Sequence, residues 1–174
     1  MFKLRSLTKR FRKNEDGVTA VEFALVATPF FLLLFAIIEV ALIFTASLVL
    51  ENATYEAARQ VRTGQISGAD PDDFTEFEGV ICDGISFLLD CDGKLHIDVR
   101  PYADFRSAGE PDPYSTGTLG GGFGFDTGVA GNVVLVRVFT TWDILTPMIG
   151  AYFANESGNS RLISAYASFR NEPF

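Results

Sequence analysis

An apolar run that is bordered at its start by a carboxylate constrains this chain more than any other feature. Glu22 precedes the run, and between Phe23 and Leu50 the only charged residue is Glu39. These 28 residues exceed the roughly 20 that are needed to cross a bilayer core. They also exceed the apolar part of a cleavable secretory signal, and no small-residue cleavage site follows them. The run therefore predicts a membrane-spanning helix.

A basic leader precedes this run. Residues 1–17 contain six Lys/Arg and two acidic residues, a net charge of +4 in a chain of −8, so the remainder carries −12. Positive charge directly before an apolar span indicates a cytoplasmic N-terminus. The acidic remainder argues against nucleic-acid binding, and against electrostatic adsorption of the outer part onto anionic lipid.

The helical pattern continues beyond the apolar run. Small and apolar residues keep a helical spacing as far as Val61, and Gly64 is a suitable terminator. Pro29 predicts a kink because it removes one helical hydrogen bond. We therefore expect a cytoplasmic leader at 1–17, a transmembrane helix at 18–50, its periplasmic continuation at 51–64, and a periplasmic domain at 65–174.

The outer domain shows three strand patterns, at 95–100, 133–142 and 161–169. We expect Pro101 to end the first strand, and His96 lies on the polar side of that strand's alternation. A sheet this small needs a helix to cover it. The predicted fold class is thus α+β: a long N-terminal transmembrane and amphipathic helix packed on a small antiparallel sheet.

Two short helices are predicted in the same domain. Asp70 and Pro71 resemble an N-cap and a first helical residue, and apolar residues follow at helical spacing. Asp143 is expected to cap another short helix, in spite of Pro147.

Residues 104–131 are rich in glycine and lack the Lys-Ser/Thr of a phosphate loop, so we expect a mobile insertion.

Few residues in the outer domain suggest chemistry. Phe123 and Phe125 in the glycine-rich loop are expected to be exposed and to form a contact surface. Cys82 and Cys91 predict a disulfide if the domain is extracytoplasmic, and two buried free thiols are the alternative. His96 is the only histidine, which argues against zinc.

The residues of the outer domain show no catalytic triad or nucleophile–base pair, so we expect neither an enzyme nor a cofactor. An acidic cluster is expected to be a solvated helix face and not a calcium loop; its members are Asp70, Asp72, Asp73, Glu76 and Glu78.

Two carboxylates lie in or beside the span. An ionisable group in lipid is costly and usually marks a partner or a function. Glu39 lies roughly 25 Å beyond Glu22 along a helix axis, close to the outer headgroups. It is either a carboxyl that reaches the interface alone or a second residue for helix pairing. Glu22 has no such simple alternative.

The order of these features resembles the class III signal of type IV pilins and pseudopilins. A basic leader is followed by Gly17, four small or aliphatic residues, Glu22, the aromatic Phe23 and a long apolar helix. The resemblance implies a pilin-like layout of the α+β fold, and that a prepilin peptidase cuts between Gly17 and Val18. It also implies that Glu22 pairs with the new α-amino group of a neighbouring subunit and so sets the register of assembly.

Further residues resemble the TadE-like pseudopilins of the tight-adherence (Flp pilus) system. They are the stretch Ala20–Val26, the Pro29-Phe30-Phe31-Leu32 segment, Ile38-Glu39, the alanines before Arg59, and the chain's end, Phe169–Phe174. Major Flp pilins are very short and typically have Glu-Tyr where this chain has Glu22-Phe23. The larger outer domain favours a minor pseudopilin.

We therefore expect a single-pass inner-membrane protein with a cytoplasmic N-terminus and a periplasmic domain. Its implied partners are the prepilin peptidase, the Flp pilin and other pseudopilins, the inner-membrane assembly platform and membrane lipid. It would prime or assist assembly of an adhesive pilus, either in the filament or in the membrane. Two alternatives are an uncleaved single-pass protein with a ligand- or surface-binding domain, and a membrane-tethered periplasmic enzyme.

Overall fold

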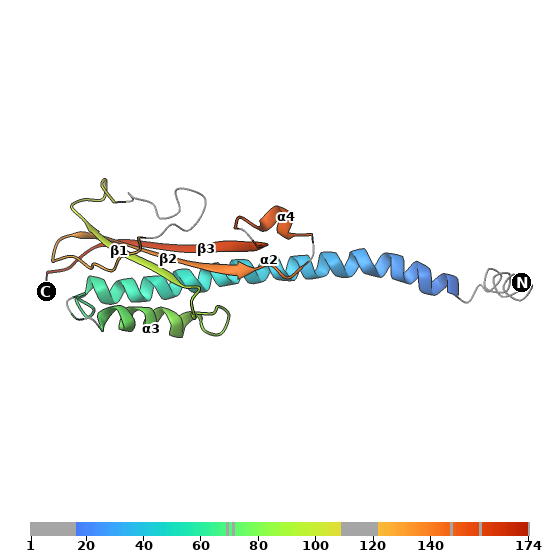
Figure 1. The fold of residues 1–174 in the computed structure, drawn as a ribbon, viewed down its shortest axis with the longest axis horizontal. Coiled ribbons are helices and arrows are strands. Elements are labelled where there is room, and N and C mark those ends of the chain that lie inside the picture. The colour runs from blue at the N-terminus through green and yellow to red at the C-terminus, as the bar shows by residue number, and fades with distance from the viewer. Residues whose placement is uncertain are drawn as a thin grey trace, which may run out of the picture.

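One helix runs most of the length of the molecule, and a small sheet lies along its C-terminal half (Figure 1). The computed structural model describes residues 17–68, 70, 72–108, 122–146, 148–156 and 158–173. The predicted leader before Gly17 lies outside these residues. The elements are α2 (Val18–Arg62), α3 (Asp73–Ile85), β1 (His96–Tyr102), β2 (Val133–Asp143), α4 (Gly150–Phe153) and β3 (Ser160–Arg170). The predicted α+β class with a pilin-like layout is confirmed.

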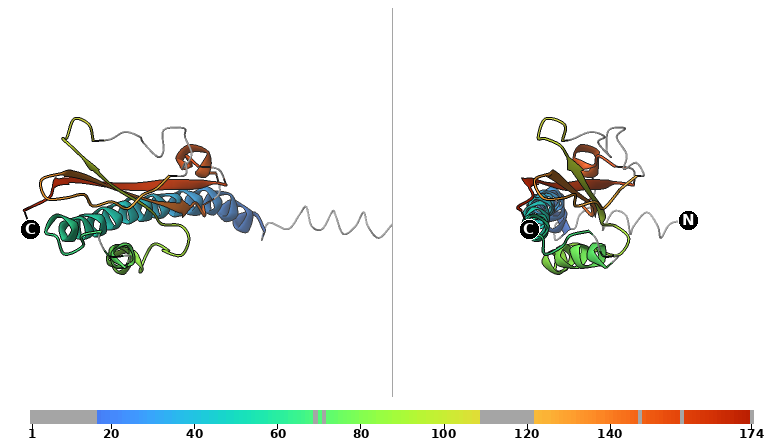
Figure 2. Two further views of the ribbon diagram at one scale, coloured as in Figure 1. Left: turned by 60° about the vertical axis from the view of Figure 1, so that its left-hand side comes forward. Right: turned by 90° about the vertical axis from the view of Figure 1, so that its left-hand side faces the viewer.

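The sheet is antiparallel, in the order β1-β2-β3. Val136 in the middle strand pairs with Val99 on one side and with Ala167 on the other. One face of the sheet carries most of the buried apolar residues and packs against the helices. Figure 2 shows that α2 and α3 both lie on this side of the sheet. Alanines on the covered side of α2, such as Ala46 and Ala57, are fully buried there and let the helix approach closely.

The helix α3 packs on α2 through a close contact at Gly84. A Cβ atom at this position would lie 2.8 Å from the Cβ of Ala53, so a larger residue would push the two helices apart. Cys82, in the last turn of α3, forms a disulfide with Cys91 beyond the helix. The disulfide closes the turn that carries the buried Leu89 into the core.

Three local predictions about element ends are wrong. The N-cap of α3 is Asp72 and not Asp70. Asp70 lies in the preceding bend, where its Oδ1 accepts a hydrogen bond from the Asp72 amide. Asp143 is the last residue of β2 and pairs with Lys94, so it does not cap a helix. β1 continues through Pro101 to Tyr102, which an edge strand tolerates.

The second face of the sheet contains a buried ion pair. Asp98 in β1 and Arg137 in β2 lie opposite each other, and their side chains are 0% and 2% exposed. Arg137 Nη2 lies 2.6 Å from Asp98 Oδ2. Asp98 Oδ1 accepts hydrogen bonds from Arg100 Nε at 2.9 Å and from the Gly124 amide at 3.0 Å. The carboxylate thus connects two strands with the returning end of the glycine-rich loop.

The end of that loop is ordered against the domain, contrary to the predicted mobile contact surface. Phe125 forms a bridge with Val99 and packs against Phe77, and Phe123 stacks on His96 at a ring separation of 5.2 Å. Both phenylalanines are therefore half-buried. His96, expected to be exposed, is half-buried by the same stacking. The remainder of the predicted insertion, 109–121, lies outside the described residues.

The C-terminal segment is attached to the far end of α2. The Asn171 side chain is buried and donates to the carbonyls of Thr127 and Val129. Glu172 donates its amide to the Arg62 carbonyl and pairs with the Arg62 side chain at 2.9 Å. These contacts fix the last strand to the end of the long helix.

Candidate functional site

The first part of α2 projects from the domain as an apolar rod. No residue from Val18 to Ile38 is buried, and most of its large apolar side chains are exposed. These 21 residues extend about 30 Å at the helical rise, which matches the thickness of a bilayer's hydrocarbon core. α2 is long and apolar enough to cross a membrane. It continues through Pro29 without a break.

Gly17 stands directly before this rod. α2 begins at Val18, and Gly17 has an ordinary φ of −90°. A Cβ atom added at Gly17 would meet nothing within 4 Å. Neither backbone conformation nor packing therefore requires glycine at this position in the folded chain.

Glu22 lies on the exposed part of α2, one turn beyond Val18. Within the described ranges its side chain has no hydrogen bond or ion pair. The neighbouring Phe23 is 71% exposed. The predicted cleavage site and two of the three predicted pairing residues, Glu22 and Phe23, thus occupy one accessible helix end, where the described residues provide no counterion for the Glu22 carboxylate.

Glu39 has a different environment, although sequence reasoning grouped it with Glu22 for subunit pairing. It is the first buried residue of α2 and is 5% exposed. Its Oε1 accepts a hydrogen bond from the Leu145 amide at 2.5 Å, and its Oε2 accepts one from the Thr146 amide at 2.7 Å. Both oxygens therefore accept hydrogen bonds from backbone amides of the same chain.

The segment that binds Glu39 is itself held by side-chain contacts. Asn159 donates through Nδ2 to the Ile144 carbonyl at 2.8 Å, and the Ile144 amide donates to the Asn159 carbonyl at 3.1 Å. Gly150 makes room for this arrangement, because a Cβ there would lie 1.5 Å from Asn159 Oδ1. Trp142 and Thr146 lie next to Glu39 and line a groove of about 450 Å³ between α2 and this segment.

Sequence reasoning missed this contact for a simple reason. Glu39 and its donors are more than 100 residues apart, and helical periodicity does not indicate which distant segment meets a given face. The exposed aliphatic residues on both sides of Glu39 gave the same apolar signal as the rest of the span. Only the presence of the carboxylate itself was a clue.

A comparison with known families matches the start of the described chain. Residues 17–59 match the family described as TadE-like protein, from the glycine before α2 to the last turns of that helix. No match is found among curated proteins or among solved structures. The TadE-like family implies a role in biogenesis of the Tad pilus, and its pilin-type members are typically not enzymes. The chain therefore carries a TadE-like family domain at residues 17–59.

Proposed function

We propose that this chain is a minor pseudopilin that is cut after Gly17 by a prepilin peptidase. Its α2 rod then packs with other pilin-like subunits and primes or assists assembly of an adhesive Flp pilus. The observation that carries this proposal is the exposed Glu22, which has no partner in the described part of the chain and lies on a helix suited to lipid.

A carboxylate in this position needs compensation. Moving an ionised carboxylate from water into an apolar medium is strongly unfavourable unless a cation lies beside it. Cleavage after Gly17 would create an α-amino group at Val18, the first residue of α2. The amine of one subunit and Glu22 of the next would neutralise each other, and their pairing would fix how far neighbouring helices are displaced along the filament.

The proposed topology has a cytoplasmic leader, one span and a periplasmic domain in the bacterial inner membrane. The basic residues before Gly17 support the orientation. The disulfide between Cys82 and Cys91 supports an oxidising compartment for the domain. In this arrangement the peptidase and the assembly platform contact the rod, and the Flp pilin and other pseudopilins pack beside it.

The processing step is tested by co-expression of the full chain with a prepilin peptidase, followed by N-terminal sequencing. We expect Val18 as the mature N-terminus. Gly17→Leu is expected to block cleavage without changing the fold, because nothing lies within 4 Å of the added Cβ. Thr19→Ala serves as a control that should still be cut. An intact Met1 would overturn processing and would favour the alternative of an uncleaved single-pass protein with a ligand- or surface-binding domain.

The pairing step is tested with Glu22→Gln. We expect normal insertion and normal amounts of protein in the membrane, but a loss of most pili counted by electron microscopy. Glu51→Gln is the matched control, since Glu51 is also an exposed glutamate on α2 but lies beyond the rod. Unchanged piliation in the Glu22 variant would show that the carboxylate does not guide assembly.

A further inference from the structure

Three of the most exposed apolar side chains of the domain lie close together in the connection between β2 and β3. Leu145 is 83% exposed, Met148 is 73% exposed and Tyr152 is 86% exposed. No residue from Ile144 to Asn155 is charged, although the chain beyond its leader is strongly acidic. A cluster of this kind on a soluble surface marks a contact with a partner or with lipid.

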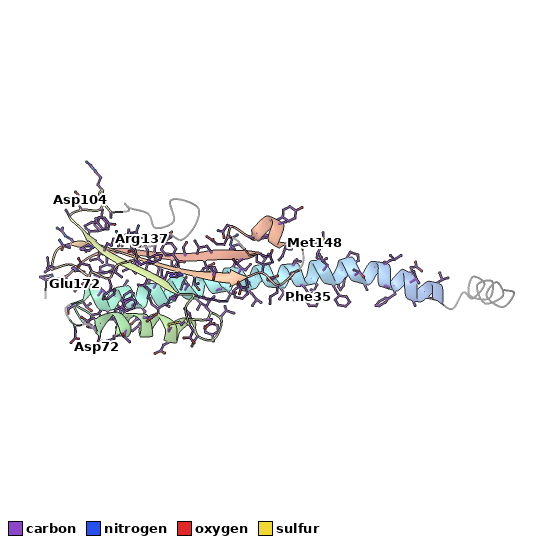
Figure 3. All side chains as sticks on the ribbon, in the orientation of Figure 1. Phe35, Asp72, Asp104, Arg137, Met148 and Glu172 are labelled. Atoms are coloured by element: carbon purple, nitrogen blue, oxygen red, sulfur yellow. A yellow bond between two sulfur atoms is a disulfide. The ribbon has the colours of Figure 1, made fainter. Side chains whose placement is uncertain are left out.

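The cluster lies where α2 leaves the domain. Glu39 fixes the amides of Leu145 and Thr146 to the helix, and the groove beside it is lined by Leu32, Phe35 and Leu145. Figure 3 shows Met148 at the end of the domain from which the rod projects, near the level of Phe35. Since the rod from Val18 to Ile38 is about as long as a bilayer core is thick, the cluster would meet the outer surface of that membrane.

Hydrogen bonds from β3 and the residue before it fix the connection that carries these exposed side chains. The Arg161 guanidinium donates to the Phe153 carbonyl at 3.1 Å and so ties α4 to β3. Met148 has a φ of +73°, a conformation that is unfavourable for a residue with a side chain. Asn159 fixes the other side of the connection to Ile144. The exposure of this apolar cluster, and the unfavourable conformation of Met148 within it, are better explained by a function than by the stability of the fold.

We propose that residues 144–153 form a foot by which the domain rests in the outer interface of its own membrane. Leu145 and Met148 would enter the boundary between headgroups and acyl chains, and Tyr152 would lie at headgroup level, where aromatic side chains with a polar end are favoured. Acyl chains would fill the groove beside Trp142. The contact is apolar, so it does not depend on anionic lipid or low salt. It rests on the proposed membrane span of α2, but not on cleavage or pilus assembly.

The test uses the full chain reconstituted in phosphatidylcholine vesicles that carry brominated acyl chains. Trp142 is the only tryptophan, so Trp142→Phe gives a background in which single tryptophans report lipid contact by quenching. Met148→Trp is expected to be quenched several-fold more strongly than Val129→Trp. Val129 is a matched control because it is 67% exposed and precedes the opposite end of β2.

A third variant separates this proposal from the proposed span. Phe30→Trp lies within the rod and should be quenched if α2 crosses the bilayer. If Phe30→Trp is quenched and Met148→Trp is quenched no more than Val129→Trp, the foot is wrong and the span stands. If Phe30→Trp is not quenched, the span fails and the foot fails with it.

A second measurement keeps Trp142 in place, in case its replacement disturbs the fold. Benzoylphenylalanine at Tyr152 should form adducts with lipid on illumination of the same vesicles. The same group at Phe105, which is exposed and follows the far end of β1, should not. An adduct between Tyr152 and a second polypeptide, with none to lipid, would overturn the proposal and indicate a protein partner.

Discussion

Several polar contacts of the domain converge on Asp98. Its two oxygens accept hydrogen bonds from Arg137, Arg100 and the Gly124 amide. The carboxylate is fully buried, and Arg137 is nearly so. A buried charge pair is tolerated when it is satisfied by several hydrogen bonds, and the loss of one member is then costly.

We therefore predict that Asp98→Ala destabilises the domain by about 3–5 kcal/mol. All the donors that converge on the carboxylate would lose their acceptor. The free energy of unfolding is measured by denaturant titration of the detergent-solubilised chain, with Trp142 fluorescence as the signal. Asp143→Ala is the control, because its pair with Lys94 is exposed and should contribute less than about 1 kcal/mol. Equal losses in the two variants would contradict the central role of Asp98.

A second residue-scale prediction concerns pH. The pKa of the Asp73 carboxyl lies below its ordinary value, chiefly because the Asp70 amide donates to it, with a further contribution from the Ser67 hydroxyl. A lowered folded-state pKa stabilises the fold above the unfolded-state pKa of about 4, and this stabilisation is lost as the pH falls through the folded-state value. The Tm difference between the native chain and Asp73→Asn should therefore shrink below pH 4.

Thermal unfolding followed by circular dichroism between pH 3 and pH 6 measures this difference. Ser67→Ala removes one donor to the Asp73 carboxylate. In this background the Tm difference that Asp73→Asn makes at pH 6 should be smaller but of the same sign. A gap that grows as the medium becomes more acidic would mean that the carboxylate is not stabilised in its charged form.

Individual residues were predicted from the sequence where the argument was local. Gly17 and Glu22 stand out because a break in pattern is visible without knowledge of the fold. The pairing of Asp98 with Arg137 was not predicted, because alternation places a residue on a face but does not identify the residue opposite. Phe123 and Phe125 were assigned to an exposed loop for the same reason, since glycine content indicates nothing about the partners of the aromatic rings.

At the scale of elements, the contact between α2 and α3 depends on one glycine. We predict that Gly84→Ala destabilises the domain by about 1–3 kcal/mol, since the added Cβ would lie 2.8 Å from Ala53 Cβ. Gly79→Ala on the same helix has nothing within 4 Å, so it should stabilise by about 0.5–1 kcal/mol through higher helix propensity. Urea unfolding of both variants measures the two changes in the free energy of unfolding. If Gly84→Ala stabilised the domain as Gly79→Ala does, the helices would not approach each other as described.

The regular elements were largely predictable from their periods. Alternation in the sequence located all three strands to within a few residues, and helical spacing followed α2 to its end. The region between β2 and β3 was not predictable. Asp143 has the residue type of a helix cap, but β2 extends as far as Asp143 because this residue pairs with Ser160 of β3. Tertiary pairing overrode the local signal there, and the short helix α4 begins only at Gly150.

At the scale of the whole molecule, α2 has two parts that differ in burial. Residues 18–38 have no contact that buries them, whereas from Glu39 onward one side of the same helix forms part of the domain core. The sequence-based boundary at residue 50 reflects where charged residues begin. The packing begins about three turns earlier, at Glu39, so the exposed rod before it is about as long as a bilayer core is thick.

The contact between Glu39 and the 145–146 amides should therefore fix the domain's position relative to the rod. We predict that Glu39→Ala increases hydrogen exchange at the Leu145 and Thr146 amides by tenfold or more, since each hydrogen bond to a charged acceptor contributes about 1.5–3 kcal/mol. Exchange is measured by mass spectrometry on the full chain in detergent, over a peptide that covers both amides. Glu22→Ala is the matched control, because Glu22 has no partner within the described ranges and its loss should leave this peptide unchanged. If both variants exchange like the native chain, the domain is held on α2 by apolar packing alone, and Glu39 does not fix its position relative to the rod.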